Sequence, residues 1–441
     1  MNSNDRLILF EDSSWRGFGP LAQTRPVWEL RCGKGTLADK IKASFKPSAI
    51  TLQPRRSLQP MFSTPGSTAD RDSQNRTLLY WNGRALPNTN VLSALPQAKY
   101  PSILEIAGEI GGVVIPPGNP DPVKFDDQGL IRSELLAGLS RVIISGRIYH
   151  HPWELIQEIP NLLDLDINCA EPLPPISYNK RDDCIICKGD HWMGAAEEVY
   201  LGAGIILSST RFTIRLERGV KIGAGSILDA DNGPIWVDEN AIIEAGAIVF
   251  GPAYIGPRSI IRSGARLSGG VSLGPECRMG GELNAVIAQG YSSKQHSGYL
   301  GNAFLGEWVN LGAATDNSDL KNNYRPIEVS MFGETINTNL LHAGVFIGDF
   351  SRTAIHTRIN TGTVVGVCCN LWGNDFSPKE IPAFTWLGSG NPQEYRLDKA
   401  LETVRAVMPR RGKELTPALE ELLRQIFRDT QDQRDNFIVK K

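Results

Sequence analysis

The chain has 441 residues, of which 41% are hydrophobic and 21% charged, enough for two or three globular domains with sizeable cores. The formal net charge is only -2 and no long run of Lys or Arg occurs, which argues against nucleic-acid or membrane-surface binding and favours a small-molecule partner. The start lacks a basic segment followed by a long apolar one, and no stretch approaches about 18 apolar residues, so we expect a cytoplasmic protein without a membrane span.

Residues 1–175 are expected to form a compact α/β domain. The short apolar segments RLILFEDS, RTLLYWNGRALP, GGVVIPPG and SRVIISGRIY are bounded by turn-forming residues and are typical of strands. Apolar residues at helical spacing predict helices over 35–44, 132–139 and 152–163.

A pair of cysteines lies in the expected linker, residues 176–198. The chain has seven cysteines, an odd and scattered set, and we expect them to be reduced because a chain of this size does not need disulfides. Cys184 and Cys187 have the C-x-x-C spacing, but a structural zinc site needs four ligands and His191 is the nearest further candidate. Small buried thiols are therefore favoured over a metal site.

An aliphatic residue recurs at every sixth position in the middle of the chain. The aliphatic positions are Val237, Ile243, Val249, Ile255, Ile261, Leu267, Leu273 and Met279, and small residues follow four positions later. Gly and Pro occupy the intervening turns, which favours short strands joined at corners, three to a coil, as in a parallel β-helix. A regular α-helix is excluded because Gly and Pro recur too often. The pattern predicts a solenoid from about 200 to about 370, interrupted near 280–298 and 312–340, within a domain spanning 199–395.

The last segment, residues 396–441, has apolar residues at helical spacing. It predicts helices over 396–408 and 416–430, with Pro409 ending the first, followed by a polar tail. Such helices are expected to cover an end or an edge of the solenoid, where backbone hydrogen-bonding groups are otherwise open.

The segment GYSSKQHSGYLGNAFLGEWVNLGAATDNSDLKNNY, residues 290–324, departs from the repeat. It places His296 on an expected loop close to Lys294, Tyr299 and a pair of asparagines. A histidine outside the repeat core is either an ordinary surface residue or part of a polar cluster that is costly to order and therefore functional.

The residue order of this segment resembles the acetyltransferase domain of the bacterial bifunctional glucosamine-1-phosphate N-acetyltransferase and N-acetylglucosamine-1-phosphate uridyltransferase family. The matching residues are His296, Tyr299, Leu300, Gly301, Ala303, Gly306, Val309, Asn310, Gly312, Ala313, Thr315, Asn323 and Tyr324. The chain resembles most closely a divergent branch of sugar nucleotidyltransferases. That resemblance also includes PLAQTRPVWELRCGKGT, GRIYHHPWEL, TGTVVGV and LDKALETVRAVMPRR, so it spans nearly the whole chain.

The resemblance implies a left-handed β-helix, a homotrimer, and acetyl-CoA bound in the groove between neighbouring solenoids. His296 is the candidate general base for transfer of an acetyl group to an amino-sugar 1-phosphate, because histidine titrates where such a base works best. The residues expected to bind the acceptor are Arg262, Lys294, Tyr299, Lys321, Asn323 and Tyr324. The lysine that the family places shortly after the Asn-Tyr pair is missing, and Lys294 or Lys321 could replace it.

The coil FLGEWVNLG places two aromatic residues, Phe304 and Trp308, at expected outward positions. Outward aromatic side chains suit a subunit interface, which agrees with the homotrimer that the resemblance implies.

The segment EDSSWRGFGPLAQTRPVWEL stands where sugar nucleotidyltransferases have a Gly-rich phosphate loop. By this resemblance the domain would bind UTP, with Mg²⁺ if it is active, through Asp12, Arg16, Arg25 and Lys34. The glycines are replaced, however, and Val27 stands in place of the expected lysine. Two hypotheses remain open: a bifunctional sugar-nucleotide enzyme, and a non-catalytic scaffold or regulatory protein that binds a nucleotide sugar.

Overall fold

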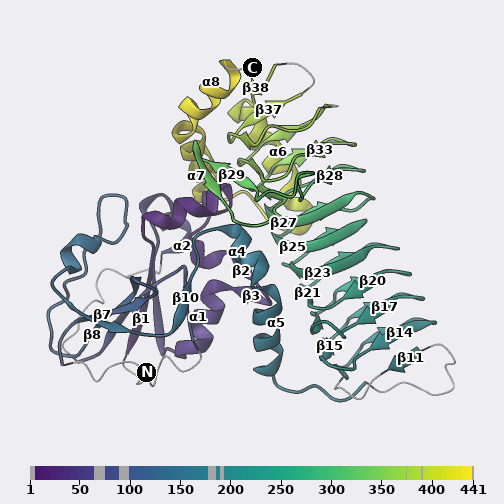
Figure 1. The fold of residues 1–441 in the computed structure, drawn as a ribbon, viewed down its shortest axis with the longest axis horizontal. Coiled ribbons are helices and arrows are strands. Elements are labelled where there is room, and N and C mark those ends of the chain that lie inside the picture. Colours follow the sequence, from purple (N-terminus) through teal and green to yellow (C-terminus); the bar gives the residue numbers. More distant parts are fainter. Residues whose placement is uncertain are drawn as a thin grey trace.

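The computed structural model describes residues 5–63, 75–88, 99–176, 185–188, 193–373, 375–388 and 391–439. It contains an N-terminal α/β domain, then a parallel β-solenoid, then a group of C-terminal helices (Figure 1). The predicted fold class is confirmed. Among the described residues, no helix combines the length and the apolar character needed to cross a membrane.

The N-terminal domain is built on a six-stranded sheet in the order β4-β1-β5-β8-β7-β9. Its strands are β1 (Arg6–Phe10), β4 (Ala49–Gln53), β5 (Leu78–Asn82), β7 (Ser102–Ile106), β8 (Glu109–Ile115) and β9 (Ser140–Ile143). Strands β4, β1 and β5 are parallel, and β8 is antiparallel to both of its neighbours. The alternate side chains of β1 enter different cores on the two sides of the sheet, which is why its sequence is an uninterrupted apolar run.

The helices of this domain follow the sequence prediction in two of three cases. Helix α1 (Leu37–Phe45) begins with a capping box formed by Thr36 and Asp39, and α4 (Pro152–Gln157) and α5 (Ile159–Asn168) cover the third predicted range. The predicted helix over 132–139 is only a short 3-10 turn, η4 (Ser133–Leu136). The remaining elements are η1 (Ser13–Ala22), η2 (Val27–Glu29), β2 (Arg31–Cys32), β3 (Gly35–Thr36), η3 (Arg56–Leu58), α2 (Gln59–Phe62), β6 (Ala85–Pro87) and β10 (Gly146–Ile148).

The solenoid stacks short strands on three faces, and they are parallel except for the last strand of the third face, which is antiparallel to its neighbour. The first face contains β11 (Ile185–Lys188), β14 (Ile205–Ser208), β17 (Ile227–Asp229), β20 (Ile248–Phe250) and the first halves of β23 (Arg266–Leu273), β25 (Glu282–Gly290) and β27 (Tyr299–Glu307). The second contains β12 (Met193–Ala195), β15 (Ile214–Leu216), β18 (Ile235–Val237), β21 (Ala253–Ile255), the second halves of those long strands, β31 (Val345–Ile347), β34 (Thr363–Val365) and β36 (Glu380–Ile381). The third contains β13 (Tyr200–Leu201), β16 (Lys221–Ile222), β19 (Ile242–Ile243), β22 (Ile260–Ile261), β24 (Arg278–Met279), β26 (Ser293–Lys294), β32 (Arg352–Thr353), β35 (Asn370–Leu371), β37 (Thr385–Leu387) and β38 (Gln393–Glu394). Strands β28 (Asp316–Asn317) and β33 (Arg358–Ile359) pair with each other.

The repeating aliphatic residues form the interior of the solenoid, as predicted. All eight positions from Val237 to Met279 are fully buried and belong to one continuous core. The small residues between them, such as Ala241 and Ala247, are also fully buried at the corners. The residues that recur at every sixth position are therefore the core residues of the solenoid.

The solenoid is longer and more continuous than the sequence indicates. Strands β11 and β12, within the expected linker, already pair with the next coil. The interruption predicted at 280–298 does not exist, because β24, β25, β26 and β27 continue the stack through it. The chain does leave the coils between β28 and β31, where it forms a hairpin of β29 (Glu328–Met331) and β30 (Glu334–Asn337).

The second face of the solenoid is covered by the N-terminal domain. Its outward aromatic side chains, including Phe304 and Phe346, pack with Trp153 of α4 in one core, and Phe304 is fully buried. Trp308 stacks between Tyr291 and Phe350 at ring distances of 4.5 and 6.3 Å, in a core shared with the C-terminal helices. The expectation that Phe304 and Trp308 form a subunit interface is therefore wrong, since this chain covers both.

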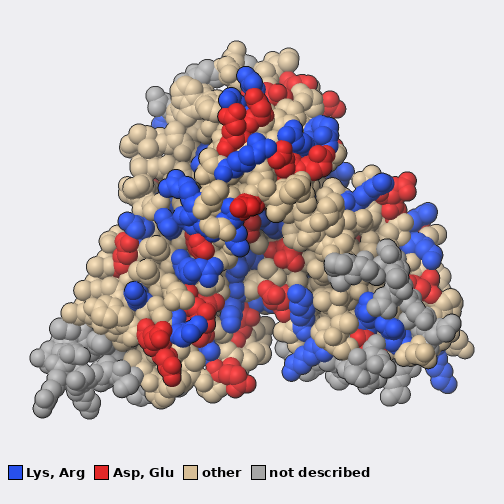
Figure 2. Space-filling model, turned by 180° about the vertical axis from the view of Figure 1, so that it is seen from behind, with Lys and Arg blue, Asp and Glu red and all other residues tan. Residues whose placement is uncertain are grey.

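The C-terminal helices are α6 (Leu397–Val407), η5 (Met408–Arg411), α7 (Pro417–Asp429) and α8 (Gln431–Val439). The first two predicted helices are confirmed, whereas α8 replaces the expected polar tail. Acidic and basic side chains are interspersed over the face of the molecule shown in Figure 2, in keeping with the near-neutral net charge.

Candidate functional site

A cavity of about 770 Å³ lies beside the carboxyl ends of the parallel strands of the N-terminal domain. We call it the N-terminal cavity. The domain contributes Trp15 and Arg16 of η1 and Arg55 and Arg56, which follow β4; Phe332 comes from the β29–β30 hairpin, and helices α7 and α8 complete the lining. Ligands of open α/β sheets bind at this edge, and the volume lies in the range of small-molecule sites.

The arginines of the N-terminal cavity differ in how they are engaged. Arg55 is buried and pairs with the buried Glu11, Nη1 to Oε1 at 2.7 Å, and its guanidinium lies 4.0 Å from the centre of the Trp15 ring. Burial and the charge of Glu11 act on Arg55 in opposite directions, and the net effect lowers its pKa. Arg16 and Arg56 are exposed, and no described carboxylate lies within ion-pair distance of either. These two side chains supply positive charge to the cavity lining, which also contains Asp429, whose carboxylate accepts a hydrogen bond from Gln425 at 2.6 Å.

Asp12, a predicted nucleotide-binding residue, is occupied within the domain. Its carboxylate accepts a hydrogen bond from Asn82 at 2.7 Å and pairs with Arg84 at 2.8 Å. Arg84 also contacts Glu109 at 2.6 Å.

The carboxylates of Glu11 and Asp12 do not fit a Mg²⁺ site. Mg²⁺ binds through free carboxylate oxygens, but Glu11 and Asp12 are both already bound to guanidinium groups. In the described part of the chain, no three His, Cys, Asp or Glu side chains are grouped to hold a metal ion. The C-x-x-C segment does not alter this, because Cys184 and His191 lie outside the described residues.

Arg25 and Lys34 do not line the N-terminal cavity. Arg25 is buried between the domains and donates two hydrogen bonds to Asp349, at 3.0 and 2.6 Å. The Lys34 ammonium lies 3.8 Å from the centre of the Trp236 ring on the solenoid. Their expected role in phosphate binding is therefore wrong: both residues hold the N-terminal domain on the solenoid, and only Arg16 of the four predicted residues lines the cavity with a free charge.

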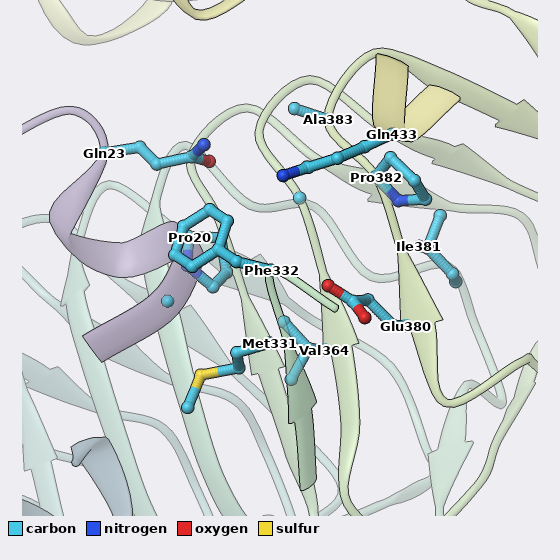
Figure 3. A pocket seen from close by; sticks show the side chains of 12 residues that line it. Pro20, Gln23, Met331, Phe332, Val364, Glu380, Ile381, Pro382, Ala383 and Gln433 are labelled. Atoms are coloured by element: carbon cyan, nitrogen blue, oxygen red, sulfur yellow. The ribbon is translucent and has the colours of Figure 1, made fainter. Parts of the chain in front are cut away.

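A narrow groove next to the N-terminal cavity shows how three parts of the chain meet. Pro20 and Gln23 of the N-terminal domain, Phe332 of the hairpin and Gln433 of α8 surround it (Figure 3). Glu380 lies at its other side, where burial raises the pKa of this carboxyl group. The hairpin and α8 thus close one side of the N-terminal cavity, which the sequence did not indicate.

His296 lies at a regular corner of the solenoid, between β26 and β27. The corner is held by its neighbours, since the Ala314 N–H donates to the Ser297 carbonyl at 3.0 Å and the Glu282 N–H donates to the Gly298 carbonyl at 3.1 Å. The imidazole is exposed, and no described side chain is hydrogen-bonded to it. The structure therefore places His296 where a ligand can reach it, without a second residue of this chain to orient the ring.

Lys294 belongs to the interior of the same corner. The residue is 1% exposed, and its ammonium donates to the carbonyls of Gly280, His296 and Gly298 at 3.2, 3.2 and 2.6 Å. A side chain at Gly281, where φ is +74°, would lie within 2.8 Å of this ammonium. Lys294 is therefore a structural residue and is not available to a phosphate, contrary to the sequence hypothesis.

The other two predicted phosphate ligands are accessible but engaged. Arg262 donates to Glu244 at 2.7 Å, and Lys321 donates to the Pro326 carbonyl at 2.9 Å. Arg262 lies on the same solenoid edge as Gln295, two coils away, since the backbone of Gly280 is packed between them. With a coil spacing of about 4.8 Å, Arg262 and His296 are about 10 Å apart along that edge.

Tyr299 is tied to residues that the sequence analysis missed. Its hydroxyl donates to Asp319 at 2.9 Å, and Asn302 donates to the same carboxylate oxygen at 2.8 Å. Asn323 and Tyr324 are exposed on the segment that follows Asp319, and the described contacts do not link them to His296. The structure thus brings Arg262 and His296 to one edge of the solenoid but does not link Asn323 or Tyr324 to them.

Comparisons with known proteins support the N-terminal assignment. Residues 7–171 match the family model described as sugar nucleotidyl transferase. This confirms the resemblance inferred from the sequence for that domain. A bifunctional sugar-1-phosphate nucleotidylyltransferase/acetyltransferase of Sulfurisphaera tokodaii is 31% identical over 88 residues, which cover 20% of this chain and 22% of that protein.

Two solved acyltransferases show distant likeness. The polySia specific acetyltransferase NeuO aligns with 48% of this chain and 86% of its own, at 12% identity and a TM-score of 0.19. The Arabidopsis UDP-N-acetylglucosamine acyltransferase aligns with 58% of this chain and 93% of its own, at 9% identity and a TM-score of 0.17. Scores this low have no bearing on the function of this chain.

Proposed function

We propose that the N-terminal cavity binds the phosphates of a nucleoside triphosphate such as UTP and serves nucleotidyl transfer to a sugar 1-phosphate. The observation that carries this proposal is the position of Arg16 and Arg56 in a large cavity at the carboxyl edge of the matched domain, where neither forms an ion pair with a described carboxylate. In this reaction a phosphate oxygen of the sugar 1-phosphate attacks the α-phosphorus, and pyrophosphate leaves with the broken P–O bond. Arginine side chains suit this work because their charge is permanent and their N–H groups match phosphate oxygens.

Calorimetry with UTP and a uridine diphosphate sugar tests the binding step. We expect the double substitution Arg16→Ala and Arg56→Ala to weaken binding about 10- to 100-fold, since two charge-assisted contacts are lost. The control is Arg132→Ala, an exposed arginine of the same domain that pairs with Glu134 and lies outside the cavity lining. Equal affinity in the double variant and the parent would contradict the proposal.

Release of pyrophosphate from UTP and a sugar 1-phosphate tests the reaction itself. The described residues do not group into a metal site, so we propose that Mg²⁺ would enter with the nucleotide. Binding without release would favour the alternative, a scaffold or regulatory protein that senses a nucleotide sugar.

A second candidate function is acetyl transfer from acetyl-CoA to an amino-sugar 1-phosphate similar to glucosamine 1-phosphate at the solenoid edge. It is favoured by the exposure of the His296 imidazole on the same edge as Arg262. His296 would accept the proton of the attacking amine, the amine would displace the CoA thiol, and Arg262 would contact the phosphate. Asn323 and Tyr324 would approach the sugar from the segment beyond β28.

This second function requires walls that one chain does not provide, so we propose a homotrimer in which a neighbouring solenoid completes the groove. Light scattering that gives a monomer mass at micromolar concentration would contradict the groove. For the chemistry, His296→Ala should lower kcat for thiol release by about 10²- to 10⁴-fold without unfolding, because an exposed corner residue contributes little packing. His356→Ala, at another exposed corner, is the matched control. Unchanged turnover in His296→Ala would remove His296 as the base.

A further inference from the structure

A small pocket between the third face of the solenoid and η5 concentrates positive charge. Its volume is about 90 Å³, and four arginines line it: Arg278 of β24, Arg352 of β32, and Arg410 and Arg411 of η5. We call it the arginine pocket. It is lined neither by the residues of the N-terminal cavity nor by His296 or Arg262.

The negative charge around the arginine pocket is far too small to balance four guanidinium groups. Glu276 is the single carboxylate of the described residues within ion-pair distance, with 3.7 Å between Arg411 Nε and its Oε2. Its other oxygen lies 3.0 Å from Arg258, so even this charge is shared. Like charges at such proximity repel, and the protein gains nothing from holding them together unless an anion joins them.

Two donors in the arginine pocket have no acceptor. The Nε atoms of Arg352 and Arg411 are buried and make no hydrogen bond. Buried N–H groups are nearly always paired, because an unmet donor costs as much as a lost hydrogen bond. Burial, followed by the neighbouring Arg278, lowers the pKa of Arg411, and burial also lowers the pKa of Arg352. Both effects indicate positive charge held without its counter-charge.

The neutral lining of the pocket is also suited to an anion. Gln295 and Asn310 line it with side-chain amides, and Tyr291 and Trp308 stack at 4.5 Å with an angle of 6° between their rings. Carboxylates are absent from the residues that line it. Its volume is several times smaller than that of the N-terminal cavity, so the space suits a group of a few heavy atoms.

We propose that the arginine pocket binds one phosphate group and thereby fixes η5, and with it the C-terminal helices, to the solenoid. Two arginines come from the solenoid and two from η5, so a tetrahedral anion between them bridges the two parts with charge-assisted hydrogen bonds. The group is either inorganic phosphate or the phosphate of a monoester whose remainder lies outside the pocket. No residue that lines the pocket belongs to the N-terminal cavity or to the predicted acetyl-transfer residues.

The test compares thermal unfolding of the parent and Arg410→Ala at constant ionic strength while phosphate is titrated. The parent should show a saturable rise in Tm, because a ligand that binds only the folded state stabilises it. Arg410 is exposed, and no carboxylate of the described residues pairs with it. Arg410→Ala should therefore still fold. Without phosphate its Tm should be higher than that of the parent, because repulsion between the arginines is relieved. It should bind phosphate at least about tenfold more weakly.

Arg218→Ala, which removes an exposed arginine elsewhere on the solenoid, is the control and should respond to phosphate as the parent does. Parallel titrations with glucosamine 1-phosphate, CoA and 3′-dephospho-CoA identify which compound supplies the phosphate. The compound that raises Tm most is the preferred ligand. A smaller rise with 3′-dephospho-CoA than with CoA assigns the bound group to the 3′-phosphate of CoA. The proposal is overturned by a rise in Tm that sodium chloride reproduces or that Arg410→Ala retains. It is equally overturned if Arg410→Ala is less stable than the parent in phosphate-free buffer.

Discussion

The ion pair between Arg25 and Asp349 gives the most demanding test of how the N-terminal domain is held. Arg25 donates two hydrogen bonds to Asp349 and lies 3.4 Å from Glu307, and Asp349 is only 2% exposed. Replacing Arg25 by Met keeps most of the volume but leaves the Asp349 carboxylate buried without a counter-charge. Removing one partner of a buried pair costs about 3–5 kcal/mol. Asp349 retains two donors, the Thr24 hydroxyl and the Glu307 N–H, both at 2.8 Å, so we expect a loss near the lower end, about 3 kcal/mol.

Urea unfolding followed by tryptophan fluorescence measures this loss, with Arg141→Met as the matched control. Arg141 forms an exposed pair with Glu105 at 2.6 Å, and removing it should cost at most about 1 kcal/mol. The double variant Arg25→Met, Asp349→Asn should lose less than the sum of its single variants, because the two residues are in contact. A free energy of unfolding for Arg25→Met within about 1 kcal/mol of the parent value would contradict this role of the ion pair.

The same variant has a pH dependence of known sign. Burial raises the pKa of Glu307, and Arg25 opposes that rise. Without Arg25, the folded-state pKa of Glu307 rises further above its unfolded value. A carboxyl group of this kind favours the folded state while protonated and loses that contribution as the pH rises. The loss of unfolding free energy in Arg25→Met should therefore be larger at pH 8 than at pH 5. A loss that grows on acidification would contradict this assignment.

Three further predictions concern the solenoid. Lys294→Met should destabilise the protein by about 1–3 kcal/mol because three carbonyls lose their donor. Burial lowers the pKa of Lys294 to about 8, so above that pH the lysine releases its proton on folding. Urea unfolding should therefore show the parent gaining stability relative to Lys294→Met between pH 8 and 10. Tyr299→Phe should cost about 1 kcal/mol through loss of the hydrogen bond to Asp319, whereas Asp319→Ala, which strands two donors, should cost more by the same assay. Trp308→Ala should cost about 3–5 kcal/mol and expose residues 397–411 to hydrogen exchange while the mass in light scattering stays that of the parent, because Trp308 packs against this chain's own helices. A change of oligomeric state in Trp308→Ala would show that Trp308 does contribute to a subunit interface.

The core of the solenoid was predictable because every coil repeats the same local requirement. An aliphatic side chain at each sixth position has only the interior to occupy, so period and burial coincide from Val237 to Met279. The predicted gap at 280–298 was wrong for a related reason: the coil keeps its strands, but Lys294 pairs with Met279 and stands where the preceding coils have an aliphatic residue. Local composition does not reveal that three backbone carbonyls bind this ammonium.

The candidate sites were less predictable because they depend on partners far away in the chain. Arg25 meets a residue 324 positions later, so a cation near a degraded phosphate loop was assigned to phosphate instead of to Asp349. Outward aromatic residues such as Phe304 indicate that a surface is covered, but they do not tell whether a second subunit or a second domain covers it. Arg16 was predicted because it lies in the segment that resembles a phosphate loop, and it lines the N-terminal cavity, whereas Arg56 and the arginine pocket have no local sequence signal.

The closure of the N-terminal cavity by α7 and α8 has a consequence for the order of events during synthesis. The strands and arginines that would hold a nucleotide leave the ribosome first, but residues 422–433, which complete the lining, follow the whole solenoid. The coils between them can form as they emerge, because each coil contacts mainly its neighbours. A nascent chain therefore carries an open, unfinished cavity until the solenoid is built, and a ligand that needs these walls would bind only to the completed molecule.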